Sequence, residues 1–283
     1  MFPLLRVSGP ALGLTREHDL IAAPRKGRVD WEAFERSAYP EAALASAIVV
    51  WRERAVEELY SLALFTELAS HLQALGAPLD WSGAFARMIA DEVRHTDLCL
   101  RMAAALGDTA PPPSIDEREL HLQGAAPSRA RVRETVVAAF CVGETLSGRM
   151  FKGARRATDV PLAADVVTAI LVDEAFHTEA GWELGALLMR PDGPTFEAER
   201  DALAARLPGL FGHYATLCLA RDGRAHAFRE PERDPGPNFG TLSRAGYARA
   251  FFEGMEADVV PGLVAIGLPE AEAAYAELLV TLA

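Results

Sequence analysis

The chain has 283 residues, 50% of them hydrophobic and 24% charged, a balance typical of a globular protein with a sizeable buried core. Its 40 acidic and 28 basic residues give a net charge of −12, which argues against binding to nucleic acid or to an anionic membrane surface. No apolar run approaches the roughly 18 residues of a membrane span, and the N-terminus lacks the pattern of a secretory signal, so we expect a cytoplasmic protein.

Four long segments carry a helical pattern of apolar residues, and no convincing alternating strand is found. These segments run over about 41–75, 82–106, 128–157 and 159–189. Gly76 and Gly107 stand at the ends of the first two, and Ser128 can cap the start of the third. Short loops join the first segment to the second and the third to the fourth, whereas the longer Pro-rich stretch 108–127 separates the pairs. We therefore expect an all-α fold, a four-helix bundle of two antiparallel hairpins with one long crossover.

The chain continues beyond the four helices to residue 283. We expect further helices over 196–221, 243–260 and 269–282, the first of them broken or kinked at Pro208 and Gly209, and a loop over 222–240. These segments would pack around the bundle. The sequence thus predicts a single domain, 1–283, with a bundle core at about 41–189 and a C-terminal helical extension at about 194–283. The first 35 residues show no clear pattern.

The second and the fourth helix each contain the pattern Asp-Glu-x-x-His. Glu92 and His95 belong to the first copy, and Glu174 and His177 belong to the second. Residues three apart lie on one face of a helix, about one turn apart, so each Glu and His can reach one metal ion together. One Glu-x-x-His is weak evidence, but two copies on alternate long helices, each with Asp directly before the Glu, are far less expected by chance.

Both Glu-x-x-His pairs lie on the apolar stripe of their helix. On the second helix this stripe includes Phe85, Met88 and Met102, and on the fourth it includes Val166 and Ile170. Moving a charge into a dry interior costs several kcal/mol even after relaxation, so carboxylates on such a stripe must be neutralised. Two divalent cations would supply the compensating charge.

Each hairpin is expected to add one carboxylate from its first helix. In the second hairpin this is Glu144, which shares an apolar stripe with Phe140. In the first hairpin the choice lies among Glu57, Glu58 and Glu67. Glu58 shares its face with apolar residues, whereas Glu57 shares its face with polar ones, so Glu58 is preferred and Glu57 is second. The expected metal ligands are Glu58, Glu92, His95, Glu144, Glu174 and His177, the set of ferritin-like di-iron carboxylate proteins.

The doubled motif resembles the di-iron oxidase and oxygenase branch of the ferritin-like superfamily. It is most similar to the p-aminobenzoate N-oxygenase family, and it also resembles the ribonucleotide reductase small subunit and bacterial multicomponent monooxygenases. The resemblance covers roughly 41–189 and implies that the six residues above are metal ligands. Two positions depart from it. Ile170 stands where some N-oxygenases have an additional histidine, and Cys99 stands where the reductase subunit has its radical tyrosine.

The resemblance also implies partners for the two histidines. In such sites the Asp before each Glu holds the histidine of the opposite helix, which would pair Asp91 with His177 and Asp173 with His95. Several side chains near the ligands could line a substrate pocket: Leu62, Cys99, Cys141, Gly148 and Ile170.

We therefore expect an oxygen-activating di-iron oxidase or monooxygenase that acts on a small organic substrate. Two iron ions would be the cofactor, although the same ligands accept a mixed manganese–iron pair. No flavin or iron–sulfur motif is visible, so electrons would come from an external reductase or from the substrate. The C-terminal helices could cover a pocket or form a homodimer. The alternative is a non-catalytic ferritin-like protein that binds iron or manganese.

Overall fold

The computed structural model describes residues 14–114, 126–219 and 236–282. Within these ranges every regular element is helical and no strand occurs, which confirms the all-α prediction. No helix in the described ranges is both long enough and apolar enough to cross a membrane. Most of the predicted crossover and most of the loop expected over 222–240 lie outside the described residues.

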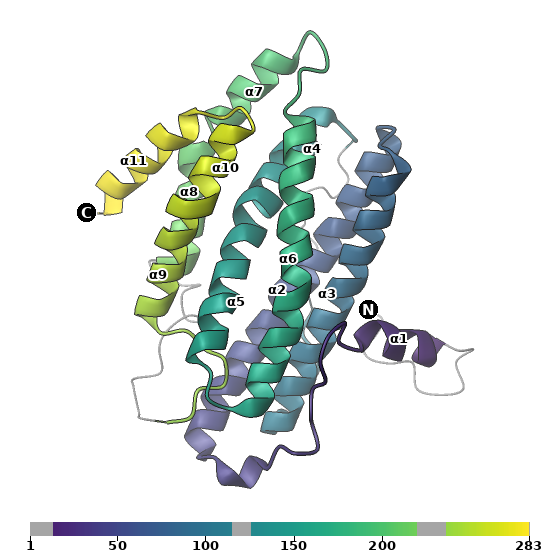
Figure 1. Cartoon of the computed structure of the whole chain (residues 1–283), viewed down its shortest axis with the longest axis vertical. Helices are drawn as coiled ribbons and strands as arrows, with labels where there is room; N and C mark the ends of the chain where they lie inside the picture. The colour runs from purple at the N-terminus through teal and green to yellow at the C-terminus, as the bar shows by residue number, and fades with distance from the viewer. Residues whose placement is uncertain (1–13, 115–125, 220–235, 283) are drawn as a thin grey trace. The chain divides into compact units, whose positions relative to one another are not determined.

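The chain divides into two compact units, and the first comprises residues 1–125, 157–173 and 231–241. Its helices are α1 (Leu14–Ala22), the short 3₁₀ helix η1 (Arg36–Ala38), α2 (Glu41–Ala74), α3 (Leu79–Leu106) and the first part of α6 (Pro161–Leu188). Figure 1 shows α2 and α3 side by side, and α1 also packs on α3. The helix α1 lies in the part of the chain for which the sequence showed no clear pattern.

A tight connection makes α2 and α3 an antiparallel hairpin. Gly76 follows α2 with φ +78°, and Gly107 ends α3 with φ +107°; both are left-handed conformations that glycine adopts without strain. The helix α3 begins directly after Pro78 rather than at the predicted Ser82. The reason is a backbone hydrogen bond of 3.1 Å from the Trp81 N–H to the Pro78 carbonyl, which already closes the first turn.

The core of the first unit lies between α2 and α3. Phe65 and Phe85 meet edge to face with their ring centroids 6.5 Å apart, and both are buried. Trp51 on α2 is also buried and donates its indole N–H to the Phe239 carbonyl at 3.0 Å. The contact between Phe65 and Phe85 packs α2 against α3, the two helices that carry the expected ligands of this unit.

The second unit comprises residues 126–156, 174–230 and 242–283. Its elements are α4 (Arg129–Thr135), the π-helix η3 (Val136–Glu144), α5 (Thr145–Ala157), the second part of α6, α7 (Phe196–Ala204), α8 (Leu207–Leu219), α9 (Arg244–Gly254), the π-helix η5 (Met255–Val259), α10 (Val260–Ala265) and α11 (Glu270–Leu282). Ser128 caps α4 as predicted, because its hydroxyl accepts the Arg131 N–H at 3.2 Å. One buried core joins η3 to the C-terminal helices.

Three expectations about the second unit need correction. The break or kink predicted at Pro208 and Gly209 is a break between α7 and α8 that lies slightly earlier, at residues 205–206. Pro208 lies in the first turn of α8, where a helix has no partner for its N–H in any case. The third long helix is continuous, but its middle is a π-helix rather than an α-helix. The helix predicted over 243–260 continues through η5 to the end of α10.

Candidate metal centres

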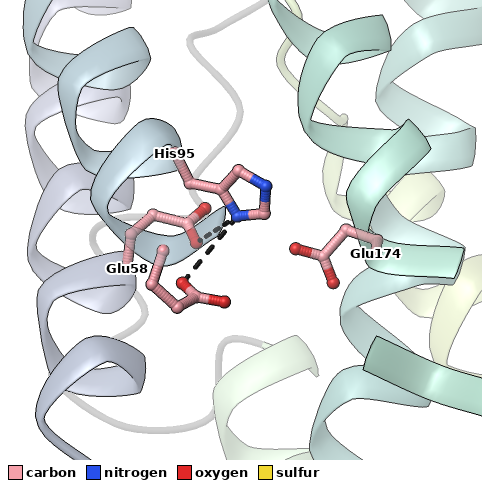
Figure 2. Close-up of side chains that lie close together, drawn as sticks. Glu58, His95 and Glu174 are labelled. Carbon is pink, nitrogen blue, oxygen red and sulfur yellow. Dashed lines mark ion pairs between the residues drawn. The ribbon is translucent and has the colours of Figure 1, made fainter. Parts of the chain in front are cut away.

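Three expected ligands of the first unit come together; we call Glu58, Glu92 and His95 the first cluster. One ligand atom from each residue lies within 4.8 Å of the others. The Nδ1 atom of His95 is 3.4 Å from the Glu58 carboxylate and 3.8 Å from the Glu92 carboxylate. Figure 2 shows Glu58 and His95 pointing toward each other from neighbouring helices. All three side chains are buried, so their charges cannot be balanced by bulk solvent.

The three glutamates considered on α2 occupy different environments. Glu58 is 7% exposed and belongs to the first cluster. Glu57 is exposed, and Glu67 is half-buried. Since successive residues of a helix point about 100° apart, Glu57 and Glu58 cannot both face α3. The geometry therefore favours Glu58 as the contribution of α2.

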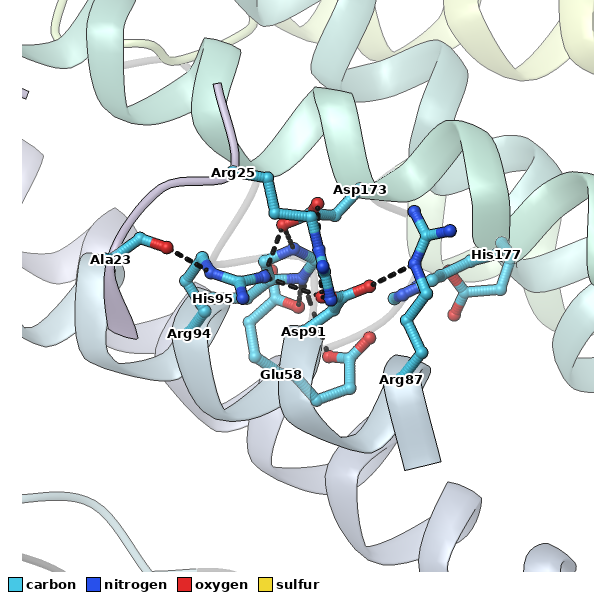
Figure 3. A network of polar contacts seen from close by, with 11 residues as sticks. Ala23, Arg25, Glu58, Arg87, Asp91, Arg94, His95, Asp173 and His177 are labelled. Carbon is cyan, nitrogen blue, oxygen red and sulfur yellow. Dashed lines mark hydrogen bonds and ion pairs between the residues drawn. The ribbon is translucent and has the colours of Figure 1, made fainter. Parts of the chain in front are cut away.

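Two fully buried aspartates lie beside the first cluster, together with two arginines. Arg94 donates from Nη1 to Asp91 at 2.6 Å and to Asp173 at 2.7 Å. Arg25, from the segment after α1, donates to Asp91 at 2.6 and 2.9 Å and lies 3.2 Å from Asp173. Figure 3 shows both guanidinium groups converging on the two carboxylates. These arginines balance Asp91 and Asp173, and so they are not the counter-charge for Glu58 and Glu92.

Asp173 also contacts the first cluster. Its Oδ2 atom lies 3.5 Å from Nε2 of His95, which is the pairing expected from the sequence. With Asp173 beside Nε2, Nδ1 of His95 is the atom that faces Glu58 and Glu92, and hence the one that can bind a metal ion. The expected pairing of Asp91 with His177 stays a prediction.

The carboxylates around His95 favour its protonated form in the metal-free first cluster. Burial by itself would lower the pKa of His95, because it penalises the charged imidazolium. Asp173, Glu58 and Glu92 outweigh this effect, and they hold the pKa of His95 well above its ordinary value. Metal binding requires the neutral imidazole, so a bound ion must displace this proton.

Metal binding at pH 7 is therefore expected to release a proton from His95. The raised pKa of His95 favours the protonated imidazole in the metal-free protein. The apparent affinity should rise with pH until the pH exceeds that pKa. Calorimetric titration in two buffers of different ionisation enthalpy measures the number of protons released. Binding without proton release, and with an affinity that does not change between pH 6 and pH 8, would contradict the protonation of His95.

The other three expected ligands come together in the second unit; we call Glu144, Glu174 and His177 the second cluster. One ligand atom from each again lies within 4.8 Å of the others, and all three side chains are buried. Glu144 is the last residue of η3, whereas Glu174 and His177 lie on α6. The Nδ1 atom of His177 is 3.5 Å from Oε2 of Glu144. Glu144, Glu174 and His177 thus repeat the Glu-Glu-His combination of Glu58, Glu92 and His95.

Glycines on α6 allow η3 to approach the second cluster closely. A Cβ atom at Gly181 would lie 2.5 Å from Cβ of Phe140, and one at Gly185 would lie 2.8 Å from Sγ of Cys141. Both glycines continue the face of α6 that carries His177, at intervals of one helical turn. The space beside Gly181 is therefore filled by Phe140, and the absence of side chains here brings Glu144 within reach of His177.

The donor atoms of both clusters suit a divalent transition metal. Carboxylate oxygens and imidazole nitrogens are accepted by iron, manganese and zinc. Three such donors in each cluster lie within 4.8 Å of one another in a buried setting, so each cluster could hold a metal ion. When the ion is bound, its positive charge would offset the buried carboxylates, which otherwise repel each other.

The residues expected to line a pocket have distinct environments. Leu62 is half-buried, whereas the other four are buried: Cys99, Cys141, Gly148 and Ile170. Burial raises the pKa of both the Cys99 and the Cys141 thiol, so neither is an activated nucleophile. That these residues border a substrate stays a prediction.

Two arginines beside the first cluster were not among the expected site residues. Arg94 stands within the first Asp-Glu-x-x-His copy, directly before His95, and a charged residue next to core-facing positions is a usable signal. Arg25 offers no such signal, because it lies in a stretch without a recognisable pattern.

Comparison with known proteins found no matching family model, no matching curated protein and no matching solved structure. A functional assignment must therefore rest on the chain's own residues.

Proposed function

We propose that this protein is a di-iron oxidase or oxygenase that activates dioxygen and oxidises a small organic substrate. One observation carries the proposal: two buried clusters have the same composition, and each contains the Glu-x-x-His pair of one long helix. Glutamate precedes each pair in the chain, at Glu58 and at Glu144. This repeated order of ligands is the reason for proposing two ions that act as a pair, within a ferritin-like four-helix bundle.

The charges around the first cluster support a bound cation. Asp91 and Asp173 already have arginine partners, as described above. Glu58 and Glu92 face the imidazole of His95, which can contribute at most one positive charge. A divalent ion would balance both carboxylates and release the proton of His95. The two carboxylates and the imidazole thus form a donor set that suits a divalent metal ion.

The chain's own residues have separate roles in this proposal. Glu58, Glu92 and His95 would hold one ion, and the three residues of the second cluster would hold the other. Asp173 would fix the His95 ring by accepting from Nε2, so that Nδ1 keeps its direction. Burial of the ligands would exclude bulk water. Two ferrous ions, when bound, would supply electrons for the reduction of dioxygen, and an external reductase or the substrate would restore them.

Anaerobic loading with ferrous iron, followed by mixing with dioxygen, tests this function. We expect about two iron ions per chain, a transient absorption band after mixing, and a faster decay of this band when a substrate is bound. Stopped-flow absorbance records the band, and elemental analysis gives the iron content. Uptake of many iron ions per chain into a multi-subunit shell would instead support the alternative, a non-catalytic ferritin-like protein that binds iron.

A further inference from the structure

The π-helix η3 immediately precedes α5 and ends at Glu144. It interrupts a helix that is otherwise α-helical from Arg129 to Ala157. π-helical segments are rare and usually single-turn, so a segment of nine residues needs support from outside the helix. The register of η3 matters for the second cluster, because one residue corresponds to roughly 100° of rotation in an α-helix. Relaxation of η3 to an α-helix would turn Glu144 relative to the residues before η3.

A tyrosine of the C-terminal helices lies against η3. Tyr214 on α8 donates its hydroxyl to the Ala138 carbonyl at 2.8 Å, which gives this backbone oxygen a partner outside the helix. The same hydroxyl lies beside Gly143, where an added Cβ would be only 2.6 Å from Oη. Gly143 directly precedes Glu144. The hydroxyl of Tyr214 thus contacts η3 at Ala138 and at Gly143, and a side chain at residue 143 would displace it.

The helix η3 also packs closely on α6. Phe140 lies against Gly181, and Cys141 lies against Gly185, as described above. Both contacts use the face of α6 that carries His177. Tyr214 and these two glycines therefore all contact η3, the segment that ends at Glu144. The 3.5 Å separation of Glu144 from His177 therefore depends on the register that η3 adopts.

We propose that Tyr214 is a positioning residue for the second cluster: its hydrogen bond to Ala138 stabilises the π-helical register that directs Glu144 toward His177. The inference rests on the proposed function, since it assigns the second cluster a metal ion. It gives the C-terminal helices a role at the metal centre, because α8 supplies the hydroxyl. It also gives a reason for glycine at residue 143.

Two substitutions remove the contact in different ways. Tyr214→Phe deletes the hydroxyl and keeps the ring, whereas Gly143→Ala pushes the hydroxyl away with a methyl group. Tyr275→Phe is the matched control. It deletes a partly buried hydroxyl of the same unit that donates to Glu256 of η5 at 3.2 Å rather than to η3.

The full-length variants are titrated anaerobically with ferrous iron, and amide hydrogen exchange over 136–144 is measured in the metal-free proteins. In Tyr214→Phe and Gly143→Ala we expect one ion to bind as in the wild type and the other to bind at least about 10-fold more weakly, as is typical when a residue that orients a ligand is lost. Exchange over 136–144 should be faster in both, and Tyr275→Phe should match the wild type.

Wild-type affinity for both ions in Tyr214→Phe would overturn the inference, and so would equal losses in Tyr214→Phe and Tyr275→Phe. Failure of the wild type itself to bind a second ion would contradict the proposed function instead. In that event, unchanged hydrogen exchange over 136–144 in Tyr214→Phe would separately overturn the role of the hydroxyl in holding the register.

Discussion

Replacing Arg94 with methionine is expected to destabilise the folded protein by about 3–5 kcal/mol, the usual effect of removing one partner from a buried ion pair. Arg94 is 3% exposed, and its guanidinium bonds to the fully buried Asp91 and Asp173. Without it, the arginines that remain near these acids are more exposed, with Arg25 at 36% and Arg87 at 40%. Chemical denaturation of the metal-free protein measures the change in the free energy of unfolding.

Arg87→Met is the matched control for this prediction. Arg87 lies 3.7 Å from the same Asp91 carboxylate, but 40% of its side chain is exposed, so its loss should change stability by less than about 1 kcal/mol. Adding Asp173→Asn to Arg94→Met removes one of the two buried charges and should recover part of the lost stability. An Arg94→Met protein no less stable than Arg87→Met would show that Arg94 does not compensate the two aspartates.

Replacing both Glu92 and Glu174 with alanine is expected to abolish binding of both metal ions. Each side chain is at most 2% exposed, and each supplies a carboxylate oxygen to its cluster. Elemental analysis of the reconstituted and desalted protein should fall from about two ions per chain to none.

Single variants on α2 sharpen this prediction. Glu58→Ala should weaken binding at the first cluster by more than about 100-fold, since a direct ligand contributes more than a residue that only orients one. Glu57→Ala is the control, because Glu57 is the exposed neighbour of Glu58 and should bind both ions as the wild type does. Stoichiometric iron retained by Glu92→Ala/Glu174→Ala, or equal losses in Glu57→Ala and Glu58→Ala, would refute the ligand assignment.

Helical spacing alone was enough to predict the composition of each cluster. Glu92 and His95 lie one turn apart on an apolar stripe. This spacing does not depend on the residues at which the helix begins and ends. The face of α2 likewise distinguished Glu58 from Glu57. The structure places Glu58 with Glu92 and His95, and it brings together the three residues expected for the second cluster. Helix ends were also predictable where a glycine with positive φ or a serine cap fixes them.

Other features of the site could not be read from the sequence. Arg25 reaches Asp91 across 66 positions of the chain, from a segment without apolar periodicity. The π-helix η3 was missed because its apolar residues fit an α-helical pattern equally well, and the difference lies in the backbone register. The break between α7 and α8 was predicted at Pro208 rather than just before it, because proline interrupts the interior of a helix but is tolerated in its first turn.

The claim that each cluster binds a metal ion is tested most directly by anomalous diffraction at the iron edge from crystals of the anaerobically iron-loaded protein. Two peaks per chain are predicted, one beside Glu58, Glu92 and His95 and the other beside Glu144, Glu174 and His177. Crystals of Glu92→Ala/Glu174→Ala prepared in the same way should show neither peak. The absence of a peak at either cluster in fully loaded wild-type crystals, or peaks only at other sites, would contradict the claim.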